Sequence, residues 1–176
     1  MIVTLIGFRG TGKSSVAPLL AARLGWRAVD ADAEIVKAAG RTIPDIFAAH
    51  RDATFRRLEA ETIAKLLAEE RIVLAAGGGA VLDPETRRRM QAAGPVVWLK
   101  ASPETIWKRI GGDLGDRGNR PRLTQSAPRA EVEQLCRQRE PLYAATASIT
   151  IETDHRSPAG AVESVPYLRR FVAAEL

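Results

Sequence analysis

Short apolar segments alternate with longer amphipathic segments along the whole chain. The apolar segments predict buried strands at residues 2–6, 28–29, 72–75, 96–99 and 148–151. Segments with apolar residues three or four positions apart predict helices at residues 13–24, 43–49, 52–69, 84–93, 103–110, 129–142 and from about 159 onward. Strands that alternate with helices predict an α/β fold, in which helices cover both faces of a parallel sheet through right-handed crossovers.

The pattern continues through all 176 residues without a linker, so we expect a single domain. Two stretches depart from it: residues 40–50, and residues 111–123, which are rich in glycine and arginine. Irregular stretches in an otherwise economical chain are usually mobile and functional. We therefore expect the second stretch to form a lid, with glycine hinges and charged arginines.

The formal net charge of +5 and the pI of about 9.9 are compatible with nucleic acid, an anionic membrane or a small anionic substrate. Aromatic residues make up only 5% and the arginines are scattered, so we expect no nucleic-acid partner. The densest run, Arg87 to Arg89, is more simply a solvated helix face. No apolar run approaches the roughly 18 residues of a membrane span. The single cysteine, Cys136, cannot form an internal disulfide, and we expect a cytoplasmic protein with no membrane partner.

The sequence GFRGTGKS at residues 7–14 follows the first predicted strand and matches the pattern G-x-x-x-x-G-K-[ST]. Glycines let backbone N–H groups turn inward around a polyphosphate, and the next helix adds its positive N-terminal end. A tight turn without a ligand is the simpler alternative, but the position between a strand and a helix favours a bound nucleoside triphosphate. The residues expected to bind it are Gly10, Thr11, Gly12, Lys13, Ser14 and Ser15. Lys13 should reach the β- and γ-phosphates, and the Ser14 hydroxyl should bind Mg²⁺.

Acidic residues near this loop indicate what happens to the γ-phosphate. Motor ATPases and GTPases place an aspartate at the end of a second apolar strand, whereas residues 72–75 run into Ala76 and three glycines. Asp30 and Asp32 follow another predicted strand, and in an extended segment residues two apart point to the same side. One carboxylate can steady Mg²⁺ and the other can accept the proton of an attacking hydroxyl. The alternative is that an acid at this point only caps the next helix.

Two further features indicate a small-molecule pocket. Gly77, Gly78 and Gly79 leave bare backbone at the carboxyl end of a strand, where open α/β sheets bind ligands; a flexible loop is the alternative. Arg56 and Glu59 lie three apart on one predicted helix, where the glutamate can fix the guanidinium; an ordinary surface ion pair is the alternative.

Together these motifs resemble those of shikimate kinases, small P-loop enzymes of aromatic amino-acid biosynthesis that use ATP to phosphorylate the 3-hydroxyl of shikimate. The resemblance runs from Gly7 to the Arg-x-Pro-Leu-Tyr segment at residues 139–143, which is most of the chain. Its specific elements are Asp30-Ala31-Asp32, Phe55-Arg56, the three glycines, Arg120-Pro121 and Arg139. It implies a P-loop NTPase fold like that of nucleoside monophosphate kinases: three layers, α/β/α, around a five-stranded parallel sheet of order 2-3-1-4-5.

The resemblance also implies roles on the acceptor side. Asp32 would hydrogen-bond the substrate hydroxyls and is the candidate base. Arg56 and Arg139 would grip the shikimate carboxylate, and the backbone of Gly78 and Gly79 would close on the ring. This acceptor side would lie mainly in a helical region at about residues 31–62.

On the nucleotide side, the resemblance assigns Mg²⁺ to Ser14, with Asp30 nearby through water. Lys13 and Arg120 would act on the transferring phosphoryl group, and Arg109 would lie against the adenine. ATP and shikimate are then the expected partners, Mg²⁺ the expected cofactor, and a monomer the expected state.

The chain departs from the family pattern in the lid and before the glycines. The lid looks longer than many in the family, which leaves Arg117, Arg120 and Arg122 as candidates for the phosphoryl contact. Arg120 is favoured because the proline behind it restricts the backbone. Ala76 stands where a hydroxyl residue is frequent, which removes one possible water or Mg²⁺ contact.

Two other functions remain open at this point. A related kinase such as a gluconate kinase shares the loop and sheet, but its polyol substrate does not require both Arg56 and Arg139. A non-catalytic module that senses ATP needs neither Asp32 nor an arginine-bearing lid.

Overall fold

The computed structural model describes residues 1–49, 52–111 and 129–165. Its core is a five-stranded parallel sheet of order β2-β3-β1-β4-β5. The strands are β1 (Ile2–Ile6), β2 (Arg27–Asp30), β3 (Ile72–Ala75), β4 (Val96–Lys100) and β5 (Ile149–Glu152). The predicted class, the parallel pairing and the strand order are confirmed.

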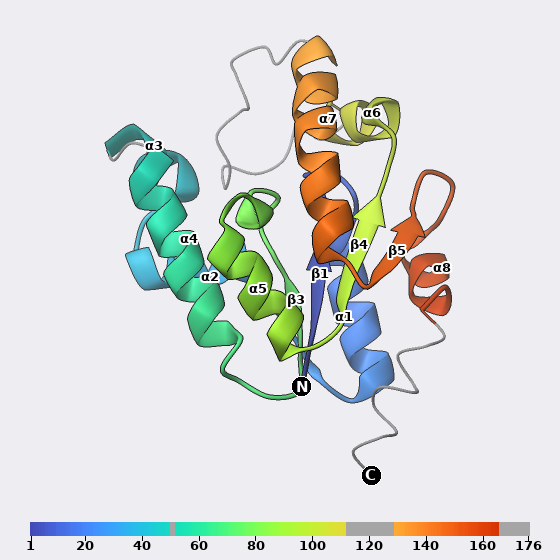
Figure 1. Cartoon of the computed structure of the whole chain (residues 1–176), viewed down its shortest axis with the longest axis horizontal. Coiled ribbons are helices and arrows are strands. Elements are labelled where there is room, and N and C mark those ends of the chain that lie inside the picture. The colour runs from blue at the N-terminus through green and yellow to red at the C-terminus, as the bar shows by residue number, and fades with distance from the viewer. Residues whose placement is uncertain (50–51, 112–128, 166–176) are drawn as a thin grey trace.

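Helices lie on both faces of this sheet (Figure 1). They are α1 (Lys13–Leu24), α2 (Ala31–Ala39), α3 (Ile43–Ala49), α4 (Asp52–Leu66), α5 (Pro84–Ala93), α6 (Pro103–Gly111), α7 (Arg129–Thr146) and α8 (Pro158–Glu163), with a 3₁₀ turn, η1, at Ala80–Leu82. Helices α1 and α8 pack on one face, and α4, α5 and α7 pack on the other. Helices α2 and α3 pack on α4 beyond the β2 edge, where they form one side of the acceptor cavity described below.

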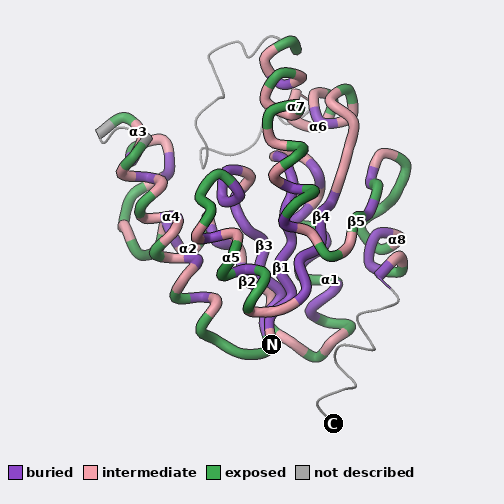
Figure 2. Tube along the Cα trace, in the orientation of Figure 1, coloured by how far each residue is buried: buried purple, intermediate pink, exposed green. Residues whose placement is uncertain are grey.

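Alternate side chains of β1 pack against the helices on opposite faces of the sheet. Val3 and Leu5 are buried with α1 and α8, whereas Ile2 and Ile6 are buried with α4 and α5. Strands buried on both faces are typical of parallel sheets covered by crossover helices. Figure 2 shows β1 and β3 buried along their length, while exposed positions follow the outer sides of the helices. Among the described residues, no helix is long and apolar enough to span a bilayer.

One local prediction is wrong. The chain does not stay extended from Asp30 to Asp32; it turns into α2, with Asp30 as the N-cap. The Asp30 carboxylate accepts a hydrogen bond from the backbone N–H of Asp32 at 3.0 Å. Asp30 therefore caps α2, as the alternative expected, and the two aspartates are placed by a strand-to-helix turn and not by an extended segment.

Two helix ends differ from the prediction by three residues or more. Helix α4 ends at Leu66 instead of residue 69, and α7 continues to Thr146 instead of ending at residue 142. The longer α7 is the helix that brings Arg139 and Tyr143 to the site.

Candidate active site

The loop after β1 is shaped to hold an anion. Gly10 and Gly12 have left-handed φ angles of 84° and 96°, which residues with a Cβ rarely adopt. The Phe8 carbonyl accepts hydrogen bonds from the Thr11 N–H at 3.3 Å and from the Thr11 hydroxyl at 2.8 Å, which closes the turn. Gly12 is also the N-cap of α1, so the positive end of that helix faces the loop.

Lys13 lies inside this loop, with only 6% of its surface exposed. Its ammonium donates to the carbonyls of Gly7 and Phe8 at 2.8 and 2.9 Å. These bonds hold a positive charge at the floor of the loop, where a phosphate can approach it.

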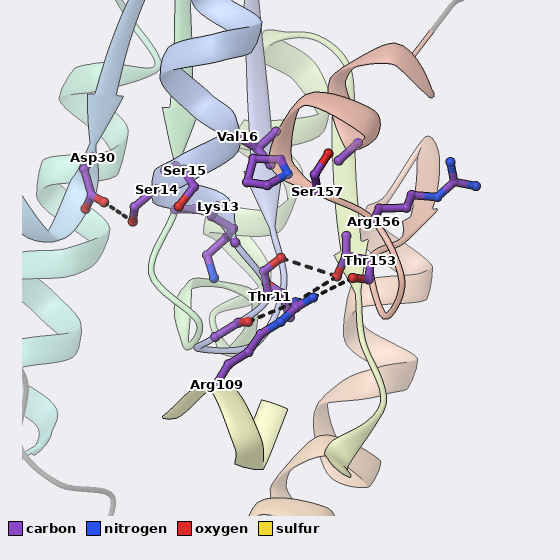
Figure 3. Close-up of a pocket in the computed structure, with 16 residues that line it drawn as sticks. Thr11, Lys13, Ser14, Ser15, Val16, Asp30, Arg109, Thr153, Arg156 and Ser157 are labelled. Atoms are coloured by element: carbon purple, nitrogen blue, oxygen red, sulfur yellow. Dashed lines mark hydrogen bonds between the residues drawn. The ribbon is translucent and has the colours of Figure 1, made fainter. Parts of the chain in front are cut away.

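The first residue after this lysine completes a site suited to a hard cation. The Ser14 hydroxyl donates to the Asp30 carboxylate at 2.7 Å, although the two residues come from α1 and the end of β2 (Figure 3). Hydroxyl and carboxylate oxygens are the ligands that Mg²⁺ prefers. Among the described residues, no group of three or more histidine, cysteine or acidic side chains could hold a metal ion. Ser14 and Asp30 would hold such a cation with two protein oxygens, and water and phosphate oxygens would have to supply the remaining ligands.

A cavity of about 390 Å³ extends from the P-loop toward the ends of β5 and α6 (Figure 3). Beyond the loop, its lining includes Arg109, Thr153, Arg156 and Ser157. The Arg109 guanidinium donates to the Thr153 carbonyl at 2.6 Å and to the Gly10 carbonyl at 3.3 Å. Arg109 thus lies beside the P-loop, and its expected contact with adenine stays a prediction.

The sequence analysis missed the β5 side of this cavity. Thr153 and Arg156 follow the strand predicted at residues 148–151, and the carboxyl end of a parallel strand is where such sheets bind ligands. That position was the available signal, but no motif marked the residues. Thr153 is 3% exposed, and its hydroxyl donates to the Thr11 carbonyl at 3.4 Å and the Lys100 carbonyl at 3.0 Å.

A second, smaller cavity of about 130 Å³ lies on the other side of the P-loop. All the residues predicted to hold the acceptor line it: Asp32, Arg56, Gly78, Gly79 and Arg139. They come from α2, α4, the turn after β3 and α7, and no local pattern joins these elements. The ring of Phe8, from the P-loop itself, is also part of the wall.

The Arg56 and Glu59 pair is part of this cavity and not of the solvated surface. The guanidinium donates to the Glu59 carboxylate at 2.6 Å, and Glu59 is 3% exposed. Burial of the carboxylate rules out the surface ion pair. The glutamate fixes one side of the guanidinium, so that Arg56 is held in place at the cavity wall.

The three glycines make room for these charged side chains. A Cβ on Gly77 would overlap the Glu59 carboxylate, and a Cβ on Gly79 would overlap the Arg56 guanidinium. None of the three has a left-handed φ, so space and not conformational freedom requires glycine at positions 77 and 79. A Cβ on Gly78 would meet only ordinary contacts, at 3.4 Å from the backbone of Arg9 and Gly7.

The Gly78 carbonyl points toward α7. It accepts a hydrogen bond from the Tyr143 hydroxyl at 2.6 Å and a longer one from Arg139 at 3.4 Å. The Arg139 guanidinium also lies over the Phe8 ring, 5.4 Å from its centroid. In the sequence, Tyr143 stands out only as the last residue of the Arg-x-Pro-Leu-Tyr segment.

The two departures from the family pattern, at Ala76 and in the lid, can be followed in the structure only for Ala76. Ala76 is 1% exposed, and its N–H donates to the Leu5 carbonyl at 3.0 Å beside the nucleotide cavity. The predicted lid beyond Gly111 lies outside the described residues, and so do its arginines, Arg117, Arg120 and Arg122.

The fold and the paired cavities define a class. A phosphate-binding loop with a hydroxyl and a carboxylate for a cation, next to a small pocket lined by two arginines and an aspartate, is the arrangement of a P-loop small-molecule kinase.

Comparisons with known proteins identify the family. A family model described as shikimate kinase matches residues 9–168. The shikimate kinase of Symbiobacterium thermophilum is 44% identical, and the match covers 89% of each chain. The solved shikimate kinase from Acinetobacter baumannii, in complex with shikimate, is 32% identical with a TM-score of 0.88, covering 99% of this chain and 94% of that one. The chain belongs to the shikimate kinase family.

The main rival enzyme class shares only the fold. A gluconokinase from Sinorhizobium meliloti is 16% identical with a TM-score of 0.59, covering 98% of this chain and 94% of that one. This likeness extends to the sheet and its helices, and it carries no information about the acceptor.

Proposed function

We propose that the protein transfers the γ-phosphate of ATP to the 3-hydroxyl of shikimate, giving shikimate 3-phosphate and ADP. The observation that carries this proposal is the acceptor cavity beside the P-loop, whose lining combines Asp32 with Arg56 and Arg139. An acceptor for such a pocket carries both a hydroxyl and a negative charge. Shikimate, an alcohol with a carboxylate, has both.

The two arginines select the acceptor. A guanidinium binds a carboxylate with two parallel hydrogen bonds, and two guanidiniums discriminate strongly against a neutral polyol. Arg56 is already held by the buried Glu59, which lowers the conformational entropy lost on binding. Gluconate also has a carboxylate, but the family membership reported above favours shikimate over it.

Asp32 is the proposed base. As the 3-hydroxyl oxygen forms its bond to the γ-phosphorus, the bond between that phosphorus and the β–γ bridging oxygen breaks, and ADP leaves with the electron pair. The hydroxyl proton passes to the Asp32 carboxylate. The N-cap bond from Asp30 to the Asp32 N–H fixes the backbone from which this carboxylate projects.

The P-loop contributes to catalysis by positioning the phosphates and by neutralising their charge. Its N–H groups and Lys13 hold the phosphates in line with the acceptor hydroxyl, so little covalent chemistry is left for the protein. Mg²⁺ at Ser14 and, through water, at Asp30 would neutralise charge on the β- and γ-phosphate oxygens. In this proposal Arg120 approaches the transferring group with the lid at residues 111–123, and Arg109 lies against the adenine.

The remaining expectations complete the proposal. The chain acts as a single-domain monomer, with residues 31–62 as the acceptor-binding helical region. In support, the exposed large hydrophobic side chains among the described residues are limited to Leu19 in α1 and Leu82 in η1. Two such side chains on separate elements do not form the apolar patch that a stable dimer would bury. The proposed location is the cytoplasm, where the lone Cys136 has no need of a disulfide partner.

A coupled assay of ADP release with shikimate, gluconate or no acceptor tests the proposed function. We expect rapid Mg²⁺-dependent ADP release with shikimate, and rates near background in the other two reactions. Activity with gluconate would support the other kinase, and ATP binding without turnover in any reaction would support the sensing module. The Lys13→Ala variant is the control, because it should lose turnover with every acceptor.

A further inference from the structure

Helix α7 directs two donors at one carbonyl. Arg139 and Tyr143 lie four residues apart, on the same face of the helix, and both donate to the Gly78 carbonyl. The two bonds differ in length: 2.6 Å from the tyrosine hydroxyl and 3.4 Å from the arginine. The tyrosine bond is short and strong, while the arginine bond is at the limit of a hydrogen bond.

Tyr143 is a rigid donor. It is 3% exposed, and its ring stacks on Trp98 with the centroids 5.7 Å apart. Burial raises the pKa of the Tyr143 hydroxyl above its ordinary value, so the hydroxyl keeps its proton at physiological pH. The hydroxyl therefore remains a hydrogen-bond donor. It donates to the Gly78 carbonyl, and the Arg139 side chain lies within hydrogen-bonding reach of the hydroxyl oxygen.

Without the Tyr143 hydroxyl, Arg139 would become the main hydrogen-bond donor to the Gly78 carbonyl. A partly buried carbonyl that loses its partner costs free energy, and the guanidinium of Arg139, which already donates to it at 3.4 Å, is a donor that can replace the hydroxyl. A guanidinium bound more closely to the carbonyl has fewer N–H groups left for a carboxylate in the acceptor cavity, which Gly78 and Arg139 both line. With the hydroxyl in place, the carbonyl is satisfied, and the guanidinium can bind the acceptor.

We infer that Tyr143 is a positioning residue for the acceptor: its hydroxyl satisfies the Gly78 carbonyl and so leaves the Arg139 guanidinium available for the carboxylate of the substrate. The inference rests on the proposed function. It assigns Tyr143 no contact with substrate and no part in nucleotide binding, since the nucleotide cavity is lined by other residues.

The Tyr143→Phe variant tests this inference, because it removes one oxygen and keeps the ring on Trp98. We expect the KM for shikimate to rise by roughly 10-fold, because the guanidinium has to give up a hydrogen bond to the carbonyl before it binds the acceptor. The kcat and the KM for ATP should stay within about twofold of wild type. An unchanged KM for shikimate, or an equal loss for ATP, would overturn the inference.

Thr146→Val is the matched control on the same helix. Thr146 is 1% exposed, and its hydroxyl donates to the Leu142 carbonyl at 2.6 Å, away from the turn at Gly78. Its removal should leave the KM for shikimate unchanged, although it also deletes a buried hydroxyl from α7. If Thr146→Val raised this KM as much as Tyr143→Phe, the effect would come from the stability of α7 and the inference would fail.

A double variant separates positioning from structure. In an Arg139→Ala background, Tyr143→Phe should raise the KM for shikimate by a clearly smaller factor than in wild type, because the two residues act through one group. Full multiplicative losses would overturn the inference, as would a Tyr143→Phe protein that no longer folds. Wild-type inactivity toward shikimate would remove the proposed function and this inference together. An active wild type with unaltered Tyr143→Phe kinetics would remove the inference alone.

Discussion

Asp32 is the residue on which the chemistry depends most. It stands in the first turn of α2, and one of its carboxylate oxygens lies 3.1 Å from the point where a Cβ would stand on Gly77. The carboxylate is therefore beside the glycine turn and the acceptor cavity, while its neighbour Asp30 is bound to Ser14 on the nucleotide side. Two aspartates two residues apart thus serve two different cavities.

An Asp32→Asn variant should lose turnover by about 10²- to 10⁴-fold, the usual contribution of a general base. Its affinity for ATP should stay close to wild type, because Asp32 does not line the nucleotide cavity. Steady-state kinetics and ATP binding by calorimetry measure the two quantities. Glu34→Gln, two residues further along the same helix and paired only loosely with Lys37 at 3.8 Å, is the control and should have little effect. Near-normal turnover in Asp32→Asn would exclude Asp32 as the base.

Arg139 and Arg137 offer a second matched pair on one helix. Arg139 lines the acceptor cavity, whereas the Arg137 side chain is 78% exposed and lies 3.8 Å from Glu133. Arg139→Ala should weaken shikimate binding by roughly 10- to 100-fold, the scale of a hydrogen-bonded charge, with little change for ATP. Arg137→Ala should change neither. Isothermal titration with each ligand checks this, and equal losses of both ligands in Arg139→Ala would indicate a structural role.

At the scale of elements, the turn between β3 and η1 organises the acceptor side. Each glycine of this turn has a different neighbour: Glu59 at Gly77, the P-loop backbone at Gly78 and Arg56 at Gly79. The charged side chains of α4 and α7 thus pack against this turn: Arg56 and Glu59 from α4, and Arg139 from α7.

The Gly79→Ala variant should raise the KM for shikimate by about 10-fold or more, because the new methyl group displaces the Arg56 guanidinium from a charge-assisted interaction. The melting temperature should fall as well, because moving the guanidinium weakens its ion pair with the buried Glu59 carboxylate. Gly78→Ala, with only ordinary contacts at its Cβ, is the comparison and should have a clearly smaller effect. If both variants had the same KM, the steric argument would be wrong.

The N-terminus of α5 allows a stability prediction with a defined pH dependence. Asp83 caps this helix, accepting from the Thr86 N–H at 2.8 Å and the Thr86 hydroxyl at 2.6 Å. The hydroxyl bond is the main reason that the pKa of Asp83 lies below its ordinary value of 3.8. A carboxylate with a lowered pKa stabilises the fold fully above the unfolded value, and that stabilisation is lost as the pH falls through the folded value.

Asp83→Ala should therefore reduce the free energy of unfolding by about 1 kcal/mol at neutral pH, the usual cost of a lost N-cap. The difference from wild type should shrink below pH 3.8, where the carboxylate becomes protonated. Urea unfolding at a series of pH values measures it. Asp83→Asn is the control, because asparagine also caps helices but does not titrate. A difference independent of pH would show that the charge of Asp83 contributes nothing.

Local patterns predicted the elements well and their junctions less well. The strands, the P-loop and the helix at residues 13–24 each have a strong signal in consecutive residues. Helix α2 escaped detection because its buried face is small: only Ala31 and Ile35 are fully buried. An acidic pair after a short strand then looked extended, although Asp30 caps a helix.

At the scale of the whole molecule, the site lies at the carboxyl ends of the parallel strands. The carboxyl ends of β1, β2, β3 and β5 supply the P-loop, Asp30, the glycine turn and Thr153. The strand order places β1 between β3 and β4, so the P-loop has the acceptor cavity on one side and the β5 wall of the nucleotide cavity on the other. Both cavities therefore share one loop, through which a phosphate can pass from one ligand to the other.

Packing of distant elements is also the reason that the sequence did not reveal the roles of Tyr143 and Thr153. Arg56, Arg139 and Asp32 were found because a family pattern carries them. The bond from Tyr143 to Gly78 joins residues 65 positions apart, and the bond from Thr153 to Thr11 joins residues 142 positions apart. No spacing rule within one helix or strand specifies such contacts, since they depend on how the elements pack.

Phosphorus NMR of the products formed from Mg·ATP and shikimate tests the central claim, direct transfer from a nucleotide in the P-loop to an acceptor in the neighbouring cavity. The account predicts one new phosphomonoester signal that grows in step with ADP, with no matching growth of inorganic phosphate. ATP that is left unchanged, or ADP that appears only together with inorganic phosphate, would contradict it.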